Sequence, residues 1–297
     1  MRRVLFATSR DHPELTADDR LAAAALNGLG VEVAPAVWAD TPPETLNGAD
    51  AVVIRSCWDY HLYPEAFEDW VTACERSGAV VINAPALLRW NLHKRYLREL
   101  ESQGVEIVPI VWVEGRDARP LGEVLRGAGW SEAVVKPAVS LSAYETWRTS
   151  PIAAAAHQAR FEALRRSGDV LVQRYAPEIA TRGEWSLVFF GGVYSHAVRK
   201  VPKPGDFRVQ MDHGGIVRRE VAPRALVQAA ERVLEVLPEA PVYARVDGIA
   251  LGDQLLLMEL ECIDPVLYFG LEPLAAERFA RGVVERLVQR RAGSPAD

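Results

Sequence analysis

Two apolar segments near the C-terminal end constrain the fold of this chain more than any other feature. Residues 242–251 and 254–262 are both predicted as β-strands, and only Gly252 and Asp253 separate them. Strands this close in sequence pair antiparallel, because a parallel pair needs a crossover of a dozen or more residues. This part of the chain is therefore predicted to contain a β-hairpin, in which side chains two residues apart share a face.

Charged residues recur at every second position of this hairpin. Arg245 and Asp247 share one face of the first strand, and Glu259 and Glu261 share one face of the second. A three-residue turn that pairs Leu251 with Leu255 would set Asp247 opposite Glu259 and Arg245 opposite Glu261. Three carboxylates on one face repel one another unless a divalent cation neutralises them, and hard oxygen ligands suit Mg²⁺ that bridges phosphates.

Two alternatives to this metal site stay open. The hairpin face could instead be a solvent-exposed acidic surface. A two-residue turn would also shift the register by one residue and send Glu259 to the other face, which would destroy the cluster.

The first 85 residues alternate short apolar strands with helical patterns. Thr16 and Asp19 resemble a capping box at the start of one helix, and Pro64 opens another. This order predicts a small, largely parallel α/β domain over residues 1–85, with strands at 3–8, 31–37, 51–55 and 79–83. The glycine pattern GxGxxG is absent after the first strand, so a dinucleotide-binding domain has little support.

The pattern changes after Pro85, where strands and helices no longer alternate strictly. Boundaries near residues 85 and 170 divide the remainder into segments 86–170 and 171–297, and neither boundary carries a flexible linker. Helices are expected at 86–103, 151–167, 223–237 and 271–291, and further strands at 185–190 and 193–201. The fold class is therefore α/β at the N-terminus and α+β in the rest.

Lys136 ends the strongly apolar segment AVVKPAV. A lysine in such a strand is costly to bury without an anion partner, so phosphate is a natural ligand. The loop that follows, SLSAYETW, offers hydroxyl and backbone N–H groups that could close over phosphates. The alternative is a strand-end lysine whose ammonium group reaches solvent.

Two further segments carry polar side chains that suit a nucleotide. The strand in DVLVQRYAPEI breaks at Gln173, Arg174 and Tyr175, which is expected to leave backbone groups free for a planar base, and Glu178 and Glu184 follow within reach of ribose hydroxyls. A Gly/Pro loop then crowds four cations, Arg199, Lys200, Lys203 and Arg208. We interpret these cations as a clamp for phosphate and a substrate carboxylate, against the alternative of a solvated basic loop.

Composition excludes several classes of protein. The net charge is −6 and no run of Lys and Arg is present, so nucleic acid is not an expected partner. No apolar stretch reaches membrane-spanning length, and the N-terminus is predicted as a strand rather than a signal peptide. The three cysteines lack metal-binding or disulfide spacing, and Cys57 is expected to be a buried thiol. A cytoplasmic enzyme fits these features, and the oligomeric state stays open, a homo-oligomer included.

Taken in order, these motifs resemble the ATP-grasp superfamily, in the branch that contains glutathione synthetase and the ribosomal-protein glutamate ligase. The matching segments are WNLHKRYL with Lys94, VVKP, VQRYAPE, GDFR and the RVD and MELE strands. The resemblance implies an ATP-grasp fold behind an N-terminal pre-ATP-grasp domain, and an ATP- and Mg²⁺-dependent ligase that forms an acyl phosphate. Two Mg²⁺ ions are expected, with Mn²⁺ as a substitute.

The resemblance also implies roles for single residues. Lys94 and Lys136 would hold phosphates, Gln173, Arg174 and Tyr175 would face adenine, and Glu184 would contact ribose. Asp247, Glu259 and Glu261 would bind Mg²⁺, while Arg245, Arg208 and Lys200 would act on the transferring phosphoryl group and the acyl phosphate. Two features depart from the superfamily: Glu261 replaces the usual metal-site asparagine, and the flap SLSAYET contains no glycine.

The segments IRSCWDYH, TRGEWSLVFF and MELECIDPVLYF further resemble a narrower ATP-grasp group. This group includes the cyclo-ligase that closes O-ureido-D-serine to D-cycloserine, which implies antibiotic biosynthesis and a small amino-acid-like substrate. Ligation of two separate molecules and a regulatory nucleotide-binding module are the rival functions.

Residues of IRSCWDYH follow a strand of the first domain, where ligands of open α/β sheets gather. Ser56, Trp58, Asp59 and Tyr60 are therefore predicted to line the substrate site, with Asp59 as partner of an ammonium group and Arg199 as a substrate contact in the basic loop. The alternative is that Trp58 and Tyr60 only pack the domain interface.

Overall fold

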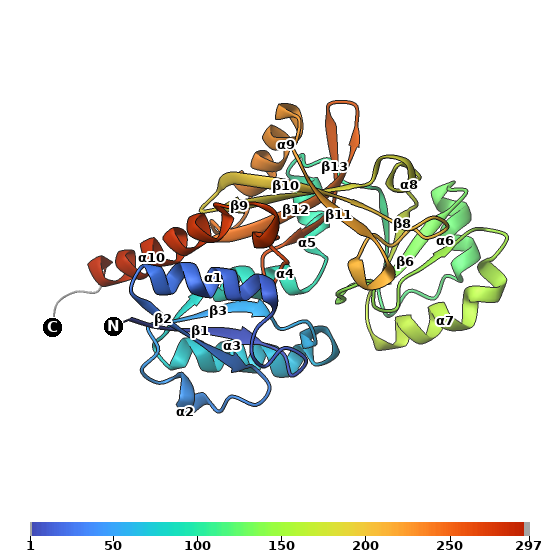
Figure 1. Cartoon of the computed structure of the whole chain (residues 1–297). Helices are drawn as coiled ribbons and strands as arrows, with labels where there is room; N and C mark the ends of the chain where they lie inside the picture. Colours follow the sequence, from blue (N-terminus) through green and yellow to red (C-terminus); the bar gives the residue numbers. More distant parts are fainter. Residues whose placement is uncertain (1, 294–297) are drawn as a thin grey trace.

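The computed structural model describes residues 2–293 of the chain. Its elements form three sheets that follow one another along the sequence (Figure 1). The N-terminal sheet and its helices are blue in Figure 1, a smaller middle sheet lies to the right in green, and the largest sheet spans the top in yellow to orange. A division of the chain near residues 85 and 170 stays a prediction.

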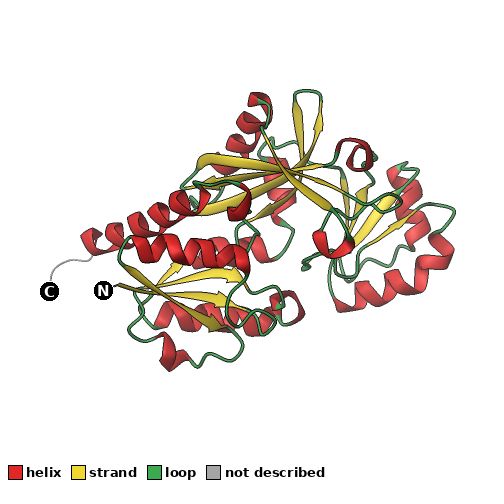
Figure 2. Ribbon diagram, in the orientation of Figure 1, coloured by secondary structure: helices red, strands yellow, loops and turns green. Residues whose placement is uncertain are grey.

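The N-terminal sheet is parallel, as the alternating pattern predicts. Its strands are β1 (Arg2–Thr8), β2 (Val31–Val37), β3 (Ala51–Ser56) and β4 (Val80–Ile82), in the order β2-β1-β3-β4. Helix α1 (Ala17–Gly28) covers one face and α3 (Pro64–Arg76) covers the other, with a short α2 (Pro43–Leu46) between β2 and β3 (Figure 2). The predicted cap is present: Thr16 Oγ1 accepts a hydrogen bond from the Asp19 N–H at 3.0 Å.

The single helix predicted over 86–103 is wrong. The chain forms α4 (Pro85–Leu92) and α5 (Tyr96–Ser102), and the helical hydrogen bonds stop at residues 93–95. The Lys94 N–H instead donates to the carbonyl oxygen of Ala138 at 2.8 Å. This tertiary bond outweighs local helix propensity, and it holds Lys94 against the end of the middle sheet.

The middle sheet is antiparallel and has the order β5-β8-β6-β7. Its strands are β5 (Ile110–Val113), β6 (Ala133–Pro137), β7 (Trp147–Thr149) and β8 (Val170–Arg174). Helices α6 (Leu121–Ala128) and α7 (Ala154–Ser167) cover it through an apolar cluster that includes Leu125 and Phe161. The strand β7 and the helix α6 were not predicted.

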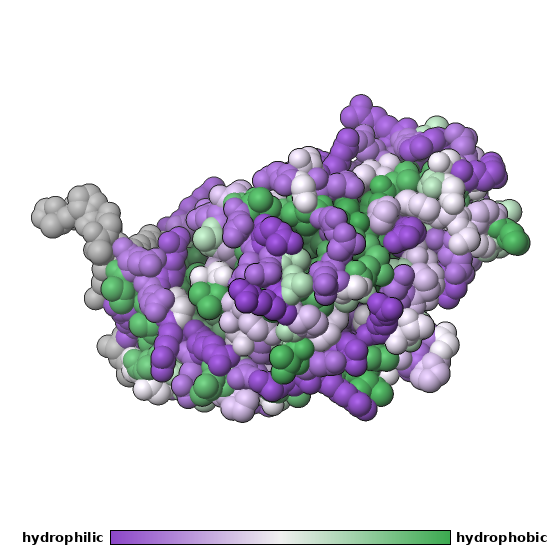
Figure 3. Space-filling view, turned by 90° about the horizontal axis from the view of Figure 1, so that it is seen from above, coloured by the Kyte–Doolittle hydropathy of each residue, from purple (hydrophilic) through white to green (hydrophobic). Residues whose placement is uncertain are grey.

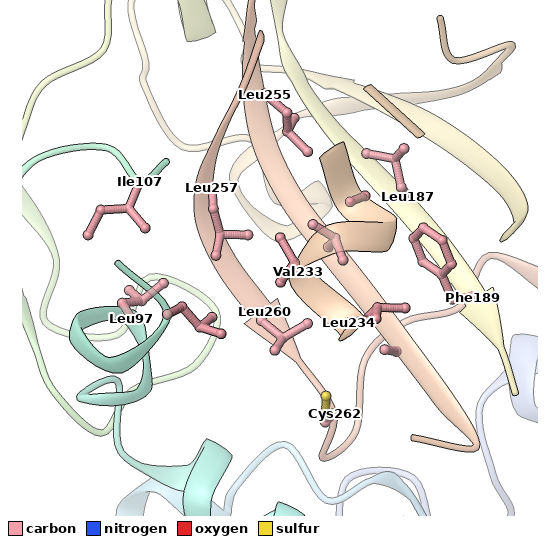
Figure 4. Close-up of a cluster of buried hydrophobic side chains, with 14 of the residues drawn as sticks. Leu97, Ile107, Leu187, Phe189, Val233, Leu234, Leu255, Leu257, Leu260 and Cys262 are labelled. Carbon is pink, nitrogen blue, oxygen red and sulfur yellow. The ribbon is translucent and has the colours of Figure 1, made fainter. Parts of the chain in front are cut away.

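The largest sheet is antiparallel, with the order β11-β10-β9-β12-β13. Its strands are β9 (Glu184–Phe190), β10 (Val193–Val201), β11 (Ile216–Glu220), β12 (Tyr243–Leu251) and β13 (Gln254–Glu261); β11 was not predicted. A short α8 (Glu178–Arg182) precedes it. Helix α9 (Arg224–Glu235) packs on one face through Val233 and Leu234, against leucines of β9 and β13 (Figure 4).

The last helix, α10 (Ala275–Gly293), ties the two ends of the chain together. Its Phe279 and Val283 share an apolar cluster with Ala22 and Leu26 of α1. Figure 1 shows α10 beside α1, over the junction between the N-terminal sheet and the largest sheet. The two parts therefore share one buried interface, as the absence of a flexible linker predicts.

The hairpin of β12 and β13 reaches the predicted pairing by a different route. Its turn has two residues, because Leu251 pairs with Gln254, and the three-residue turn is therefore wrong. A β-bulge then shifts the register between Asp247 and Gly248 and leaves Met258 between the pairs Asp247–Glu259 and Gly248–Leu257. The bulge restores the pairing that the turn alone would have destroyed.

Gly248 makes this bulge feasible. A Cβ atom at this position would lie 2.6 Å from the carbonyl oxygen of Leu256 and 2.9 Å from Cδ1 of Leu255. Any larger residue would therefore push the two strands apart.

Among residues 2–293, no helix combines the length and the apolar character that a membrane span requires. The face drawn in Figure 3 interleaves hydrophilic residues with smaller hydrophobic patches.

Candidate active site

A cavity of about 250 Å³ lies between the middle sheet and the largest sheet. Strands β6 and β8 supply one wall, and β9, β10, β12 and β13 supply the other. Most residues singled out from the sequence line it: Trp58, Lys94, Lys136, Gln173, Arg174, Tyr175, Glu184, Lys200, Arg208, Arg245, Asp247, Glu259 and Glu261. The fold thus gathers residues from Trp58 to Glu261 in one place.

The hairpin presents its three carboxylates to this cavity. Arg245 Nη2 lies 2.8 Å from Asp247 Oδ2 and also contacts Glu261. Burial raises the pKa of the Asp247 carboxyl, but Arg245 and Lys200 outweigh it and hold the pKa at about 2. Burial and the charges of Asp247 and Glu259 raise the pKa of Glu261 to about 7 despite Arg245. The three carboxylates are therefore held in contact with Arg245, Lys200 and Lys94.

The donor set fits a hard divalent cation. The three side chains offer carboxylate oxygens on one face, which are the ligands that hard divalent cations prefer. No ready-formed group of three or more metal ligands exists among the described residues. Salt bridges to Arg245 and Lys94 engage the carboxylates instead, and Mg²⁺ would compete with them.

Three lysines line the cavity in different electrostatic settings. Lys94 Nζ lies 2.7 Å from Glu259 Oε1 and donates to the carbonyl of Ser140. Lys200 contacts Glu184 and lies 3.5 Å from Asp247 Oδ2. Burial lowers the pKa of Lys200, but Asp247 and Glu184 raise it above its ordinary value overall.

Lys136 differs from the other two lysines. It is 8% exposed and forms no salt bridge with any residue in the described part of the chain. Burial lowers the pKa of its ammonium group, against the charge of Glu259. A buried cation without a direct partner calls for an anionic ligand, and the cavity gives such a ligand access.

The end of β8 was predicted to leave backbone groups free for a planar base, but two of these groups are hydrogen-bonded. The backbone N–H of Arg174 donates to Pro109 O at 2.9 Å, and that of Tyr175 donates to Glu132 O at 3.1 Å, so these two groups are not free for a base. The guanidinium carbon of Arg148 lies 4.0 Å from the centre of the Tyr175 ring. Glu178, at the start of α8, does not line the cavity. Any contact of Arg174 or Tyr175 with adenine would therefore use their carbonyl groups or side chains.

Two loops border the cavity. In the loop 202–215, Arg208 lies 2.9 Å from Asp206, which holds the pKa of that carboxyl well below its usual range. In the predicted flap, Ser142, Ala143 and Glu145 adopt positive φ angles without being glycine. The ring of Tyr144 in this flap lies 5.0 Å from that of His61, so the flap touches the N-terminal part of the chain.

Four of the predicted substrate contacts lie outside the cavity, which corrects their expected position. The Ser56 hydroxyl donates to buried Asp19, and Asp59 accepts a hydrogen bond from Trp38 Nε1 at 2.6 Å. Tyr60 is buried and stacks on Phe67. Arg199 forms a salt bridge with Glu220 at 2.7 Å. In each case a partner within the fold occupies the side chain, and of the IRSCWDYH residues singled out only Trp58 lines the cavity.

Sequence reasoning missed several residues at the site. Ser186 Oγ donates to Asp247 Oδ1 at 2.5 Å, and its position two residues after Glu184 in β9 could have revealed it. Met258 faces the cavity because of the bulge, and Asp264 and Tyr268 line it from the segment after β13. No local pattern marks these three positions.

Comparison with known proteins identifies relatives of this arrangement. A family described as "D-cycloserine synthetase DcsG, N-terminal domain" matches residues 4–83. The cycloserine biosynthesis protein DcsG of Streptomyces lavendulae is 33% identical over 260 residues, which cover 80% of this chain and 83% of that protein.

Solved structures show the same fold. The crystal structure of D-cycloserine synthetase DcsG covers 96% of this chain and 99% of its own, with a TM-score of 0.85 and 24% identity. D-alanine–D-alanine ligase from Bacillus anthracis covers 98% and 99%, with a TM-score of 0.69 and 13% identity. A RimK-domain ATP-grasp protein from Sphaerobacter thermophilus gives a TM-score of 0.68 at 17% identity, with 94% and 98% coverage. The chain therefore belongs to the DcsG family, has the ATP-grasp fold and is an ATP-dependent ligase.

Proposed function

We propose that this ligase activates the carboxylate of a small amino-acid-like substrate as an acyl phosphate and closes a C–N bond within the same molecule. The specific reaction proposed is the cyclisation of O-ureido-D-serine to D-cycloserine. The observation that carries the proposal is one cavity in which unpaired Lys136 lies with the carboxylates of the hairpin. The 33% identity to a cycloserine biosynthesis protein supports the substrate.

The cations of the cavity match the charges of the first step. A substrate carboxylate oxygen attacks the γ-phosphorus of ATP and ADP leaves, so negative charge shifts along the phosphate chain. Lys136 and Lys94 hold the phosphates, while Arg245, Arg208 and Lys200 stabilise the transferring phosphoryl group and the acyl phosphate. Gln173, Arg174 and Tyr175 contact adenine, and Glu184 contacts ribose.

Asp247, Glu259 and Glu261 would hold Mg²⁺ at the phosphates. The metal would neutralise charge on the phosphate oxygens, and we expect two ions, replaceable by Mn²⁺. The extra charge of Glu261, where ATP-grasp ligases usually carry asparagine, is consistent with such strong demand for cations.

The second step forms the ring. The ureido nitrogen bound to oxygen attacks the acyl carbon and phosphate leaves, while the carbamoyl group departs by hydrolysis as carbamate. Because nucleophile and electrophile belong to one molecule, proximity supplies much of the rate, and no pocket for a second substrate is needed.

Incubation of the enzyme with ATP, Mg²⁺ and O-ureido-D-serine alone tests this function. We expect D-cycloserine, ADP and phosphate to appear in equal amounts. Release of ADP only after a separate amino acid is added would instead establish ligation between two molecules. ADP release without any new C–N bond would establish a kinase.

A further inference from the structure

The segment 262–267, directly after the metal-binding hairpin, is held by an unusual set of hydrogen bonds. All six of its successive carbonyl oxygens lie within hydrogen-bonding distance, 2.8–3.1 Å, of side-chain groups from elsewhere in the chain. The partners, in the order of the carbonyls, are Asn83, Tyr243, Trp58, Arg55, Arg245 and His196. Such a segment is fixed in position, as residues that support a binding site usually are.

One polar side chain of this fixed segment has no role in holding it. Asp264 is 2% exposed and lines the cavity, and its Oδ2 has no hydrogen-bond partner among residues 2–293. An unpaired buried acceptor costs about 1–3 kcal/mol. A fold that fixes the backbone on both sides and leaves this carboxylate unpaired is arranged for a ligand.

The surroundings of Asp264 indicate the charge of that ligand. Burial, together with the charge of Glu261 on the same cavity wall, raises the pKa of Asp264 well above its ordinary value. The lysines that suit phosphate and carboxylate lie on other strands, Lys136 on β6 and Lys200 on β10. A group that donates hydrogen bonds and carries positive charge would satisfy this end of the cavity.

Arg55 is the cation that offers a rival explanation. Its Nε donates to Asp19 at 2.9 Å and its Nη2 donates to Pro265 O at 3.0 Å, but its Nη1 has no partner among the described residues. Asp264 could therefore serve only to balance the charge of Arg55. Because Arg55 is already paired with Asp19 and no salt bridge joins it to Asp264, we favour a ligand.

We infer that Asp264 binds the α-ammonium group of the amino-acid substrate and so selects amino acids over carboxylic acids that lack this group. This inference rests on the proposed function and adds the residue that recognises the substrate amine. The role takes the place of the one predicted for Asp59, whose carboxylate is bonded to Trp38. In the cyclisation the α-amino group is not the nucleophile, so its recognition can be tested apart from the chemistry.

The test compares two substrates in three enzymes. O-ureido-D-serine and its analogue without the amino group, 3-(ureidooxy)propanoic acid, carry the same carboxylate and the same nucleophile. For the wild type, we expect kcat/KM measured by ADP release to favour the amino acid by about 10⁴-fold, the scale on which a site built to hydrogen-bond a substrate amine rejects an analogue without it. In Asp264→Asn this ratio should fall to about fivefold or less, because the neutral amide gives the ammonium group no counter-charge.

Asp59→Asn is the matched control and should keep the wild-type ratio. The KM for ATP and the melting temperature of Asp264→Asn should stay near those of the wild type, since the change is isosteric. Equal loss of activity on both substrates, with the ratio unchanged, would overturn the inference and support the Arg55 explanation.

Failure of the proposed substrate gives a different result. A wild-type enzyme inactive on both compounds would overturn the cyclisation and leave the amine contact to be decided with D-alanine against propanoate, and D-serine against 3-hydroxypropanoate. If neither amino acid stimulates ADP release more than its partner acid, the inference about Asp264 falls too.

Discussion

Two buried Arg–Asp pairs lie within residues 2–293, and their surroundings differ. Arg55 and Asp19 are each about 2% exposed, and aromatic rings of Tyr243, Phe269 and Phe279 surround the guanidinium group. Arg245 and Asp247 are also buried, but they line the cavity with further carboxylates beside them. The first pair is closed off and joins α1 to β3 within the N-terminal part of the chain. The second is open to a ligand, and the carboxylates beside it are oxygen donors that a metal ion would use.

The largest expected effect comes from removing a carboxylate charge at the cavity, either Asp247 of the open pair or Glu259 opposite it. Asp247→Asn and Glu259→Gln should each lower kcat by about 1,000-fold or more, because each removes a carboxylate that would bind Mg²⁺. The melting temperature should change by only a few degrees. ADP release and thermal unfolding measure the two quantities, and Asp40→Asn, at an exposed pair with Arg10, serves as the control. Full activity in either variant would remove the metal site.

Disruption of the closed pair, Arg55 and Asp19, should instead lower stability and leave ATP binding unchanged. Arg55→Met leaves Asp19 buried without its cation, which we expect to lower the free energy of unfolding by about 3–5 kcal/mol. Denaturant unfolding measures this change, and the KM for ATP of the folded enzyme should stay close to that of the wild type. A variant as stable as the wild type would mean that the pair does not stabilise the packing of α1 on β3.

Lys136 extends this comparison, because it is a buried cation that forms no salt bridge with any of the described residues. Lys136→Ala should raise the KM for ATP by about 10- to 100-fold and lower kcat, because the ammonium group meets phosphate in both the ground and the transition state. Its stability should not fall, since the variant removes a buried unpaired charge. Steady-state kinetics with Arg119→Ala as control test this. Unchanged kinetics would make Lys136 a structural residue.

The smallest expected effect concerns pH and the segment 262–267. Burial lowers the pKa of His196 to about 4 from its ordinary value of 6.5, although the Leu267 carbonyl and Glu272 raise it. The folded state therefore favours the neutral ring, so its contribution is complete above about pH 6.5 and is lost as the pH falls toward 4. Between pH 7 and pH 5 the wild type should lose about 1–2 kcal/mol more stability than His196→Gln. Parallel stability curves for the two proteins would contradict this.

Local sequence patterns were enough for much of the N-terminal domain and for the hairpin strands. Apolar strands that alternate with capped helices specify a parallel sheet, and the cap at Thr16 forms as expected. The two-residue period of a strand likewise places Arg245 with Asp247 and Glu259 with Glu261. These features depend only on neighbours along the chain, which explains why they could be predicted.

Other features depend on contacts that the sequence does not display. The helix predicted over 86–103 breaks because Lys94 bonds to Ala138, and Asp59 turns away from the cavity because Trp38 binds it. Burial within tertiary structure, rather than local propensity, decides both outcomes. The flap without glycine is a further case, since Ser142, Ala143 and Glu145 adopt positive φ angles that their residue types do not predict.

The sequence by itself therefore determined which residues share a strand face, but not how the two strands align. A two-residue turn sets one register, and the bulge at Met258, which Gly248 accommodates, shifts it so that the carboxylates meet. Likewise, the sequence shows Asp264 only as one acidic residue in a loop. Its unpaired place in the cavity comes from side chains as distant as Asn83 and His196, which hold the backbone before and after it. Side-chain alternation is a local property of a strand, whereas register and burial are set by the whole fold.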